Sequence, residues 1–451
     1  MVFWYDMSKP VDTYSQNFNN WRPHPSVNAD IIITSTSFVI TRFATLNDAV
    51  KCYIPDQTKN FPGMKVEVKG IVDGQELYWG YSANVKLVNI TQDGTYDIPP
   101  LGTVNGNLSF RNGNIVGACN ITITQLPSGQ SVPTNEILKA NPYLQDHSGN
   151  NRPLKLNNFM FAAMSGVGGY DIASTNILPD RANVTVTDNR IIHITKKLST
   201  TDNMVNIVPA NSNPTHKFKV TGLSDGRQVS LVNRNGGFYT FDNGEHEVTL
   251  TYPEGTTSLY NAIGVTGSTG DMDVTIEFIP RYPNALVTDG VDDYGVVENF
   301  KSLQNYMMFF QCAIIRPATS KGMFSTTPIE GNIKGWMLLQ GNSANEVRFG
   351  NNVYKNFNVT SSIGDKISYV LSANNELMTC YVGEEKATVT GTYKQTGANM
   401  SLFLSDNNNK TRFGSMAFYK SILFDSVPTK ENDGFTEQDL IDYVLENLIT
   451  K

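Results

Sequence analysis

Apolar and polar residues alternate along most of the chain, and this alternation predicts β-strands. Val66 and Val68 alternate with charged residues, and Ile121 and Ile123 alternate with threonines. A period of two with one apolar side is typical of a strand that buries one face. Asp-Gly and Asn-Gly dipeptides separate these stretches and favour tight turns. The pattern therefore predicts an all-β protein.

The chain contains this pattern twice. Residues 65–70 and 217–222 share the order Lys, apolar, charged, Val, polar, Gly, and residues 120–127 and 273–280 share an alternating stretch that ends in proline. The matches fall on strand-like stretches and the loops between them differ. We therefore predict two related β-sandwich domains, residues 30–127 and 158–281, joined by a connector, residues 128–157. The corresponding core positions are Val66 and Phe218, Val68 and Val220, Ile121 and Val274, and Ile123 and Ile276.

Residues 285–451 have a different pattern and form a third predicted domain. The strand candidates are Phe309–Ile315, Trp336–Leu339, Ile367–Leu371, Thr379–Val382, Leu402–Leu404 and Ser415–Phe424. Thr436 is a good helix N-cap, with Asp439 three residues later as in a capping box. Apolar residues then recur at helical spacing from Leu440 to Ile449. We expect this C-terminal helix to pack on the third domain or on the domain before it.

The N-terminal residues 1–29 have no periodic pattern, although they contain many aromatic side chains. These are Phe3, Trp4, Tyr5, Tyr14, Phe18 and Trp21. Aromatic surface left in water is unfavourable by roughly 25 cal/mol per Å². We therefore interpret residues 1–29 as a docking segment that becomes ordered in a groove of a partner or a sister subunit. The alternative is that the segment folds back on the first domain of its own chain.

Charge and composition restrict the partners. The net charge is −7 and there is no basic run, so neither nucleic acid nor an acidic membrane surface is expected to bind. No apolar stretch approaches the ~18 residues of a membrane span, so no membrane insertion is expected. Only 17% of the residues are charged, and uncharged polar surfaces of this kind are common in extracellular and virion proteins.

Four cysteines occur without a Cys-x-x-Cys pair, which excludes a zinc ribbon. Cys52 could pair with Cys119 in the first domain, and Cys312 with Cys380 in the third. The other interpretation is four buried free thiols, because strand cores accept cysteine as a small apolar residue.

The start and the end of the third domain carry a resemblance. Residues 285–297 contain an apolar residue, then Asp289-Gly290-Val291-Asp292-Asp293-Tyr294, then alternating apolar residues. This stretch resembles the opening strand of laminin-G-like, concanavalin A-like jelly rolls. Residues 414–424 are similar to the last strand of that family. The predicted helix that begins at Thr436 is similar to the tail that commonly follows this strand. The resemblance implies a jelly roll with a C-terminal helix over residues 285–451.

A second resemblance covers residues 141–170. The stretch from Asn141-Pro142 to Ser148-Gly149-Asn150, then Leu156–Phe159 and Ser165–Tyr170, resembles segments of virion proteins from phages of Bacteroides-type hosts, the crAss-like group among them. This resemblance implies a fibre or appendage protein of a virion, assembled in the host cytoplasm. Residues 1–29 would then dock on other virion proteins, and a homo-oligomer is expected.

Catalytic patterns are not found in the sequence. Retaining glycosidases on concanavalin-like folds need carboxylates about 5 Å apart, from a Glu-x-Asp-x-x-Glu arrangement that does not occur here. The five histidines lack partners at metal-ligand spacing. We therefore predict no enzyme and no cofactor. Asp289, Asp292 and Asp293 are either solvated turn residues or ligands of a calcium ion, which prefers clustered carboxylates.

Aromatic residues remain as candidates for ligand binding. Trp79, Tyr81 and Trp336 could stack on sugar rings, although packing in a core is the competing interpretation for both tryptophans. Together these observations predict a phage virion structural protein, a head or tail fibre or appendage, that adheres weakly to host or mucosal glycans. The alternatives are a bacterial surface or secreted glycan-binding protein, and a structural spacer or capsid decoration without a ligand.

Overall fold

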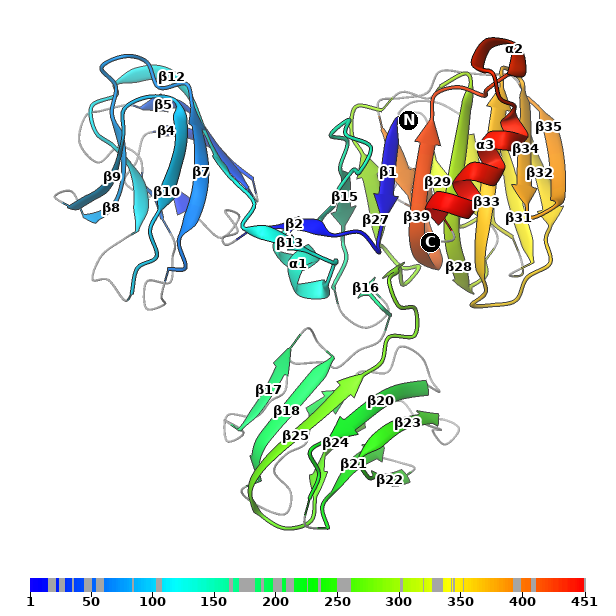
Figure 1. The fold of residues 1–451 in the computed structure, drawn as a ribbon, viewed down its shortest axis with the longest axis horizontal. Helices are drawn as coiled ribbons and strands as arrows, with labels where there is room; N and C mark the ends of the chain where they lie inside the picture. The colour runs from blue at the N-terminus through cyan, green and yellow to red at the C-terminus, as the bar shows by residue number, and fades with distance from the viewer. Residues whose placement is uncertain are drawn as a thin grey trace. The chain divides into compact units, whose positions relative to one another are not determined.

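The structure is a computed structural model of the 451-residue chain. It describes residues 1–449 except 15–21, 24–28, 35, 44–50, 54–60, 83–84, 103–107, 162–164, 170–182, 188–189, 198–204, 208–214, 225, 234–236, 250–260, 301–302, 319, 327–335, 342, 344, 352, 392–398 and 407–410. The chain divides into two compact units. One consists of Met1–Lys9 with Pro133–Lys451, and the other of Pro10–Val132. The fold is all-β, with two related sandwiches, a concanavalin A-like jelly roll and a C-terminal helix (Figure 1).

The unit Pro10–Val132 is the first sandwich. Its first sheet has the order β10 (Gly94–Ile98), β7 (Met64–Lys69), β12 (Gly117–Gln125), β5 (Ser37–Phe43) and β4 (Ala29–Ile33). Its second sheet has the order β3 (Arg22–Pro23), β6 (Lys51–Tyr53), β11 (Ser109–Asn112), β8 (Leu77–Ser82) and β9 (Val85–Ile90). A separate pair, β2 (Val11–Thr13) and β13 (Gly129–Ser131), joins the two ends of the unit.

The second sandwich repeats the strand order of the first, except that the described residues contain no counterpart of β3. One sheet has the order β17 (Val184–Thr187), β18 (Ile191–Lys197), β25 (Gly270–Phe278), β20 (Thr215–Thr221) and β23 (Gly244–Thr249). The other has the order β19 (Val205–Ile207), β24 (Asn261–Thr266), β21 (Gln228–Asn233) and β22 (Gly237–Phe241).

The register of the central strands shows that the two sandwiches are copies. Ile123 lies opposite Val68 across β12 and β7, and Ile276 lies opposite Val220 across β25 and β20. The eight core positions predicted from the repeat all have an exposed fraction of 0%. The alternation of buried and exposed positions is identical along β12 and β25, and again along β5 and β18. The prediction of a duplicated sandwich is therefore confirmed.

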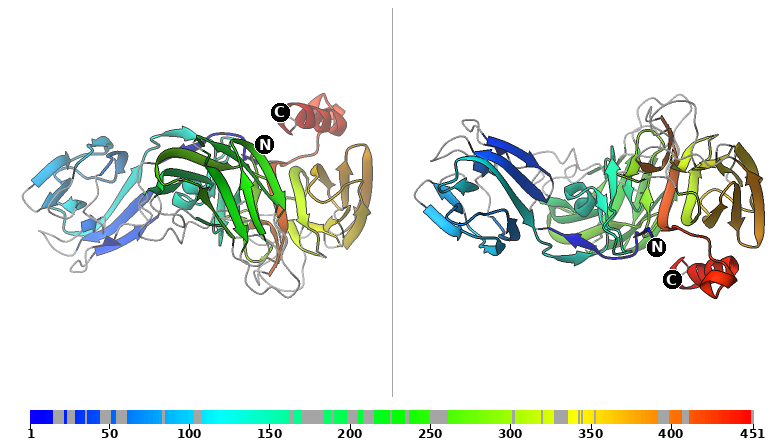
Figure 2. Two further views of the ribbon diagram at one scale, coloured as in Figure 1. Left: turned by 90° about the horizontal axis from the view of Figure 1, so that it is seen from below. Right: turned by 90° about the horizontal axis from the view of Figure 1, so that it is seen from above.

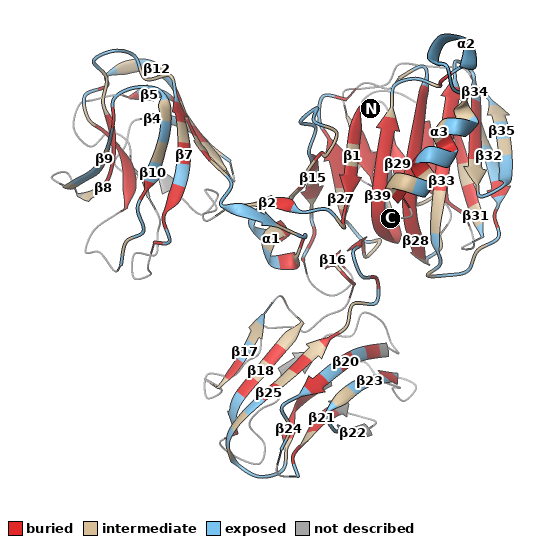
Figure 3. Cartoon of the chain, viewed as in Figure 1, coloured by how far each residue is buried: buried red, intermediate tan, exposed pale blue. Residues whose placement is uncertain are grey.

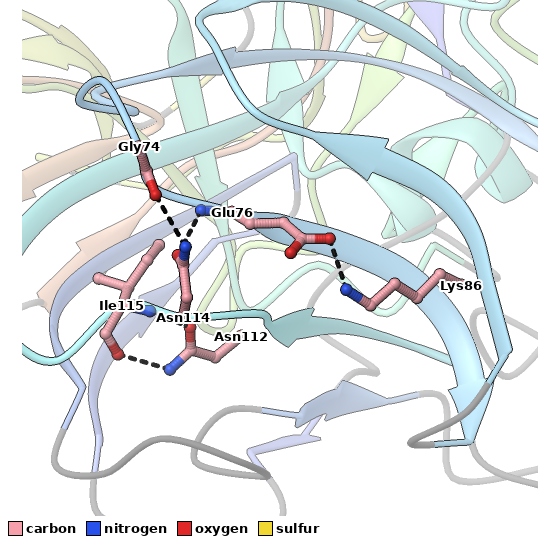
Figure 4. A network of polar contacts seen from close by, with 6 residues as sticks. All are labelled: Gly74, Glu76, Lys86, Asn112, Asn114 and Ile115. Carbon is pink, nitrogen blue, oxygen red and sulfur yellow. Dashed lines mark hydrogen bonds and ion pairs between the residues drawn. The ribbon is translucent and has the colours of Figure 1, made fainter.

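The turns of the two copies are held by different side chains. In the first sandwich the Asn114 amide accepts from the Glu76 backbone N–H at 2.6 Å and donates to the Gly74 carbonyl at 2.7 Å (Figure 4). At the corresponding place in the second sandwich, the guanidinium of Arg227 donates to backbone carbonyls of the following turn, including that of Asp271 at 2.9 Å. In both sandwiches a side chain therefore links the same two neighbouring turns, but an asparagine amide does so in the first sandwich and an arginine guanidinium in the second.

The jelly roll consists of two eight-stranded sheets. One has the order β16 (Gly166–Val167), β26 (Leu286–Val287), β39 (Ser415–Phe424), β28 (Tyr306–Arg316), β33 (Lys366–Asn374), β34 (Leu377–Val382) and β35 (Glu385–Thr390), and β1 (Phe3–Asp6) also pairs with β39. The other has the order β14 (Tyr143–Leu144), β15 (Leu154–Asn157), β27 (Tyr294–Val297), β36 (Met400–Leu402), β29 (Gly322–Ser325), β30 (Trp336–Gln340), β31 (Glu346–Asn351) and β32 (Val353–Asn358). A small hairpin, β37 (Leu404–Asp406) and β38 (Thr411–Phe413), forms a separate two-stranded sheet. Figure 3 shows β28 and β39 buried along nearly their whole length.

The jelly roll is discontinuous in sequence, which corrects the predicted boundaries. Residues 143–157, predicted as part of a connector, supply two of its strands, β14 and β15, and the helix α1 (Asn135–Ala140) precedes them. β16 and β26 pair like the arms of a hairpin, with the second sandwich inserted between them. The first sandwich is inserted between β1 and α1. Short two-residue strands carry no periodic signal, so the sequence pattern could not assign these segments.

The C-terminal helix packs on the outer face of the β39–β28–β33 sheet (Figures 1 and 2). A short helix, α2 (Lys430–Asp433), precedes α3 (Glu437–Val444), which continues as a π-helical turn, η3 (Leu445–Ile449). Thr436 and Asp439 form the predicted capping box. Ile441 and Val444 are buried against sheet residues that include Phe309. The predicted helix and its packing on the third domain are confirmed.

Candidate functional site

The first strand of the chain completes the jelly roll. β1 pairs antiparallel with β39, so that Phe3 lies opposite Leu423 and Asp6 opposite Lys420. Phe3 and Tyr5 have exposed fractions of 0% and belong to the jelly-roll core, where their rings stack with centroids 4.7 Å apart. Trp4 faces the opposite side of the sheet and packs near the C-terminal helix.

These positions correct the prediction of a docking segment over residues 1–29. Phe3, Trp4 and Tyr5 are part of a folded domain in their own chain, and that domain is the third rather than the first. Tyr14 is half-buried in the other unit, and Phe18 and Trp21 lie outside the described residues. Aromatic content alone could not reveal the partner strand, because that strand lies more than 400 residues away in sequence.

A loop from Asp146 to Arg152 closes over the free side of β1. The Trp4 N–H donates to Asp146 Oδ1 at 2.9 Å, and the His147 N–H donates to the Trp4 carbonyl at 2.8 Å. The Tyr5 hydroxyl donates to the Arg152 carbonyl at 2.6 Å, and the Asn150 side chain donates to the carbonyl of Met1 at 2.8 Å. Asp146 also fixes its own loop, since Oδ2 accepts from the Arg152 N–H at 3.0 Å. β1 therefore lies in a slot between β39 and this loop, which we call the β1 slot.

Trp79 and Trp336, predicted to bind sugars, are both buried with exposed fractions of 0%. The Trp79 ring lies 5.2 Å from that of Phe61, and the Trp336 ring stacks on Tyr306 at 3.7 Å between centroids. Leu231 is the residue of the second sandwich that corresponds to Trp79. It lies opposite Ile263 as Trp79 lies opposite Phe110, and it is also fully buried. A buried indole offers no face to a ligand, so the core interpretation is correct for both residues.

Tyr81 is half-buried and packs against the core of the first sandwich. One exposed aromatic residue that the sequence reasoning missed is Phe238, with an exposed fraction of 62%, on the edge strand β22. Tyr239 and Phe241 pack against the core of the second sandwich, so Phe238 and Thr240 lie on the other face of the strand. The sequence alone could not tell which of these two faces is outward.

The carboxylates of Asp289, Asp292 and Asp293 converge at the start of β27. Their carboxylate oxygens lie within 4.8 Å of one another. Among the described residues, these three side chains form a cluster that could hold a metal ion. The Asp293 carboxylate is fully buried and accepts from the Ser165 hydroxyl at 2.8 Å and from the Asp289 N–H at 3.0 Å. Burial, together with the neighbouring carboxylates, raises the pKa of Asp293 to about 7.

This donor set fits a calcium ion, because hard oxygen ligands at this separation are those that calcium takes. The turn also has partners of its own. Arg316 donates to the Asp289 carbonyl, and both oxygens of Asp293 accept hydrogen bonds from the protein. The three residues therefore form a turn that could hold a cation, and whether it does so stays a prediction.

The cysteines that the structure describes are free thiols. Cys312 and Cys380 are buried in the jelly-roll core, and burial raises the pKa of both well above the ordinary value. Cys119 is half-buried and unpaired, while the side chain of Cys52 lies outside the described residues.

No helix in the described part of the chain is long and apolar enough to cross a membrane.

No known protein family matches the sequence, and no curated protein matches it either. Among solved structures, the sialidase of Trypanosoma rangeli in complex with sialic acid aligns with 93% of this chain and 84% of its own, at 10% identity and a TM-score of 0.27. A truncated AlyQ with CBM32 and alginate lyase domains aligns with 56% of this chain and 98% of its own, at 10% identity and a TM-score of 0.24. The binding domain of botulinum neurotoxin DC in complex with SialylT also aligns at 10% identity, with a TM-score of 0.25; the alignment covers 34% of this chain and spans 40% of the toxin chain. Similarities this low carry no argument about function.

Proposed function

We propose that the chain is a structural protein of a phage virion, of the fibre or appendage type, that holds host or mucosal glycans through weak, repeated contacts. The observation that supports this proposal is the duplicated sandwich. One jelly roll carries two copies of the same domain, each inserted at the end of a paired β-ladder. Insertion at these points adds the same sandwich twice without interrupting the core of the domain that carries both copies.

Duplication suits adhesion because two weak contacts on one chain reinforce each other. A single glycan contact with a Kd near 1 mM corresponds to about −4 kcal/mol. Linking two such contacts raises the overall affinity by roughly 10²–10⁴-fold where the geometry allows both to engage. The proposal includes no catalytic step, since the Glu-x-Asp-x-x-Glu arrangement of concanavalin-like glycosidases does not occur in the sequence.

The virion setting rests on the resemblance of residues 141–170 to phage proteins. Those residues include the Asp146–Arg152 loop that closes the β1 slot, so the resembling segment has a structural role in this chain. Mass spectrometry of purified particles tests the setting. Recovery of the chain in stoichiometric amounts supports it, and recovery only in a bacterial envelope or secreted fraction contradicts it.

A structural spacer without a ligand is the second candidate. It is favoured by the burial of Trp79 and Trp336, which removes the two strongest aromatic candidates from the surface. A glycan array with the full chain separates the two functions. Binding to a defined group of glycans supports adhesion, and no binding at millimolar glycan concentration supports the spacer.

A further inference from the structure

The β1 slot is built entirely by residues 133–451 of the jelly roll. β26 covers one part of the β39 edge, opposite Ala417 and Phe418, and β1 covers the next part, Lys420–Leu423. An empty slot would leave four consecutive positions of β39 without a neighbouring strand on one side, since β28 pairs with the other side. Open strand edges of this kind readily pair with another chain.

The slot recognises its strand by backbone and side chains together. The N–H and the carbonyl of Trp4 both bond to the Asp146–His147 loop, while the N–H groups of Val2 and Met7 bond to β39. Phe3 and Tyr5 fill the core beneath it, and Asp6 forms an ion pair with Lys420 above. Alternating side chains added to a sheet edge in this way give both affinity and specificity.

The strand leads directly into the other compact unit, whose two ends are held together by the β2–β13 pair, so that exchange depends on the short segment between Met7 and Val11. Residues 1–9 belong to the jelly-roll unit, but the chain continues from Lys9 into Pro10–Val132 before it returns at Pro133. The strand of a second copy carries the same residues and would make the same contacts. Exchange of an identical terminal element between copies is therefore close to neutral in contact energy and becomes favourable as concentration rises.

We propose that β1 exchanges between copies of this chain, so that the first strand of one copy fills the slot of another and joins the two subunits. This inference concerns how copies assemble, and it stands whether or not the chain binds glycans. It assigns the first strand a second role as the linking element of a homo-oligomer.

A pair of cysteine variants can detect the exchange directly. Trp4 and Ile422 are opposite each other, and both backbone groups of Trp4 face the loop rather than β39. Side chains come closest at such non-hydrogen-bonded pairs, within the range that a disulfide spans. A chain with Trp4→Cys and a separate chain with Ile422→Cys can form the 4–422 disulfide only between copies.

The two variants are mixed at high concentration, incubated and oxidised, and the products are separated without reductant. The inference predicts a species of twice the chain mass, with a peptide that joins positions 4 and 422. Mixing Trp4→Cys with Thr95→Cys, an exposed position on β10, should give no such link. A chain with both Trp4→Cys and Ile422→Cys shows that the variants fold, through an intramolecular disulfide.

Two results would overturn the inference. One is an intramolecular disulfide in the double variant with no 4–422 link in the mixture. The other comes from the unaltered chain, as a mass by light scattering that stays monomeric at every concentration. A mass that rises with concentration, and that returns to the monomer when residues 1–7 are deleted, supports exchange.

Discussion

Asp6 and Lys420 form an ion pair that joins the first strand of the chain to the last, with 3.3 Å between Oδ2 and Nζ. The Asp6 side chain is fully buried and that of Lys420 is 6% exposed. Lys420 Nζ also donates to the carbonyl of Leu448 in the C-terminal helix at 3.1 Å. One ammonium group thus connects both ends of the chain to the same sheet.

Replacing Asp6 should destabilise the jelly roll strongly. Asp6→Ala leaves a buried ammonium without its carboxylate, which costs about 3–5 kcal/mol in comparable buried pairs. Urea unfolding followed by tryptophan fluorescence measures this change. Lys9→Ala, at an exposed position on the same segment, is the control and should change the free energy of unfolding by less than about 1 kcal/mol. An equally small effect of both substitutions would contradict the structural role of the pair.

The duplicated cores should respond alike to the same substitution. Ile123→Asp and Ile276→Asp each place an unpaired charge in a fully buried position, and each should cost several kcal/mol in its own sandwich. Thr122→Asp and Thr275→Asp, on the opposite faces of the same strands, should have small effects. Hydrogen exchange resolved along the sequence shows which sandwich opens. Opening of both sandwiches by a single substitution would show that the two copies do not fold as separate cores.

Glycines at corresponding positions give a second matched test. A Cβ on Gly222, whose φ is +86°, would lie 1.8 Å from the Asp273 carbonyl oxygen, and a Cβ on Gly70 would lie 1.9 Å from that of Asn120. Gly222→Ala should therefore separate β20 from β25. Gly226→Ala meets no atom within 4 Å and should cost only the roughly 1–2 kcal/mol of a positive φ. Similar thermal midpoints for the two variants would contradict this packing.

The Asp293 carboxylate should make stability depend on pH. Its pKa is raised by burial from the ordinary value of 3.8 to about 7, so the folded state holds the proton more tightly than the unfolded state. The resulting stabilisation is present at low pH and is lost as pH rises from about 4 to about 7. Asp293→Asn should remove this dependence, which thermal unfolding between pH 4 and 8 measures. Calcium should raise the midpoint of the unaltered chain at pH 8 but not that of the variant, and equal shifts in both would exclude this site.

The sequence predicts those parts of the fold whose partners share a periodic pattern. The strands around Val68 and Val220 could be found because alternation marks a half-buried face, and the helix from Glu437 could be found from its cap and spacing. The slot for β1 could not be found, since Phe3 and Tyr5 pair with a strand at the other end of the chain. Trp79 was open to two interpretations because alternation places a residue on one face without saying which face is inward.

The acidic turn shows the same limit at the level of a site. The spacing of Asp289, Asp292 and Asp293 indicated a carboxylate cluster, and the structure brings the three together. The hydroxyl that bonds Asp293 comes from Ser165, which lies 128 residues earlier, before the inserted second sandwich. A contact across an inserted domain leaves no local signal in the sequence.

The most direct test of the account is glycan binding by the full chain with one sandwich disabled at a time. Binding to immobilised host or mucosal glycans is compared for the unaltered chain, the Ile123→Asp variant, the Ile276→Asp variant and the variant with both changes. The account predicts that loss of either sandwich lowers the apparent affinity by at least about tenfold, and that loss of both abolishes binding. Binding that persists unchanged when both sandwiches are unfolded would contradict it.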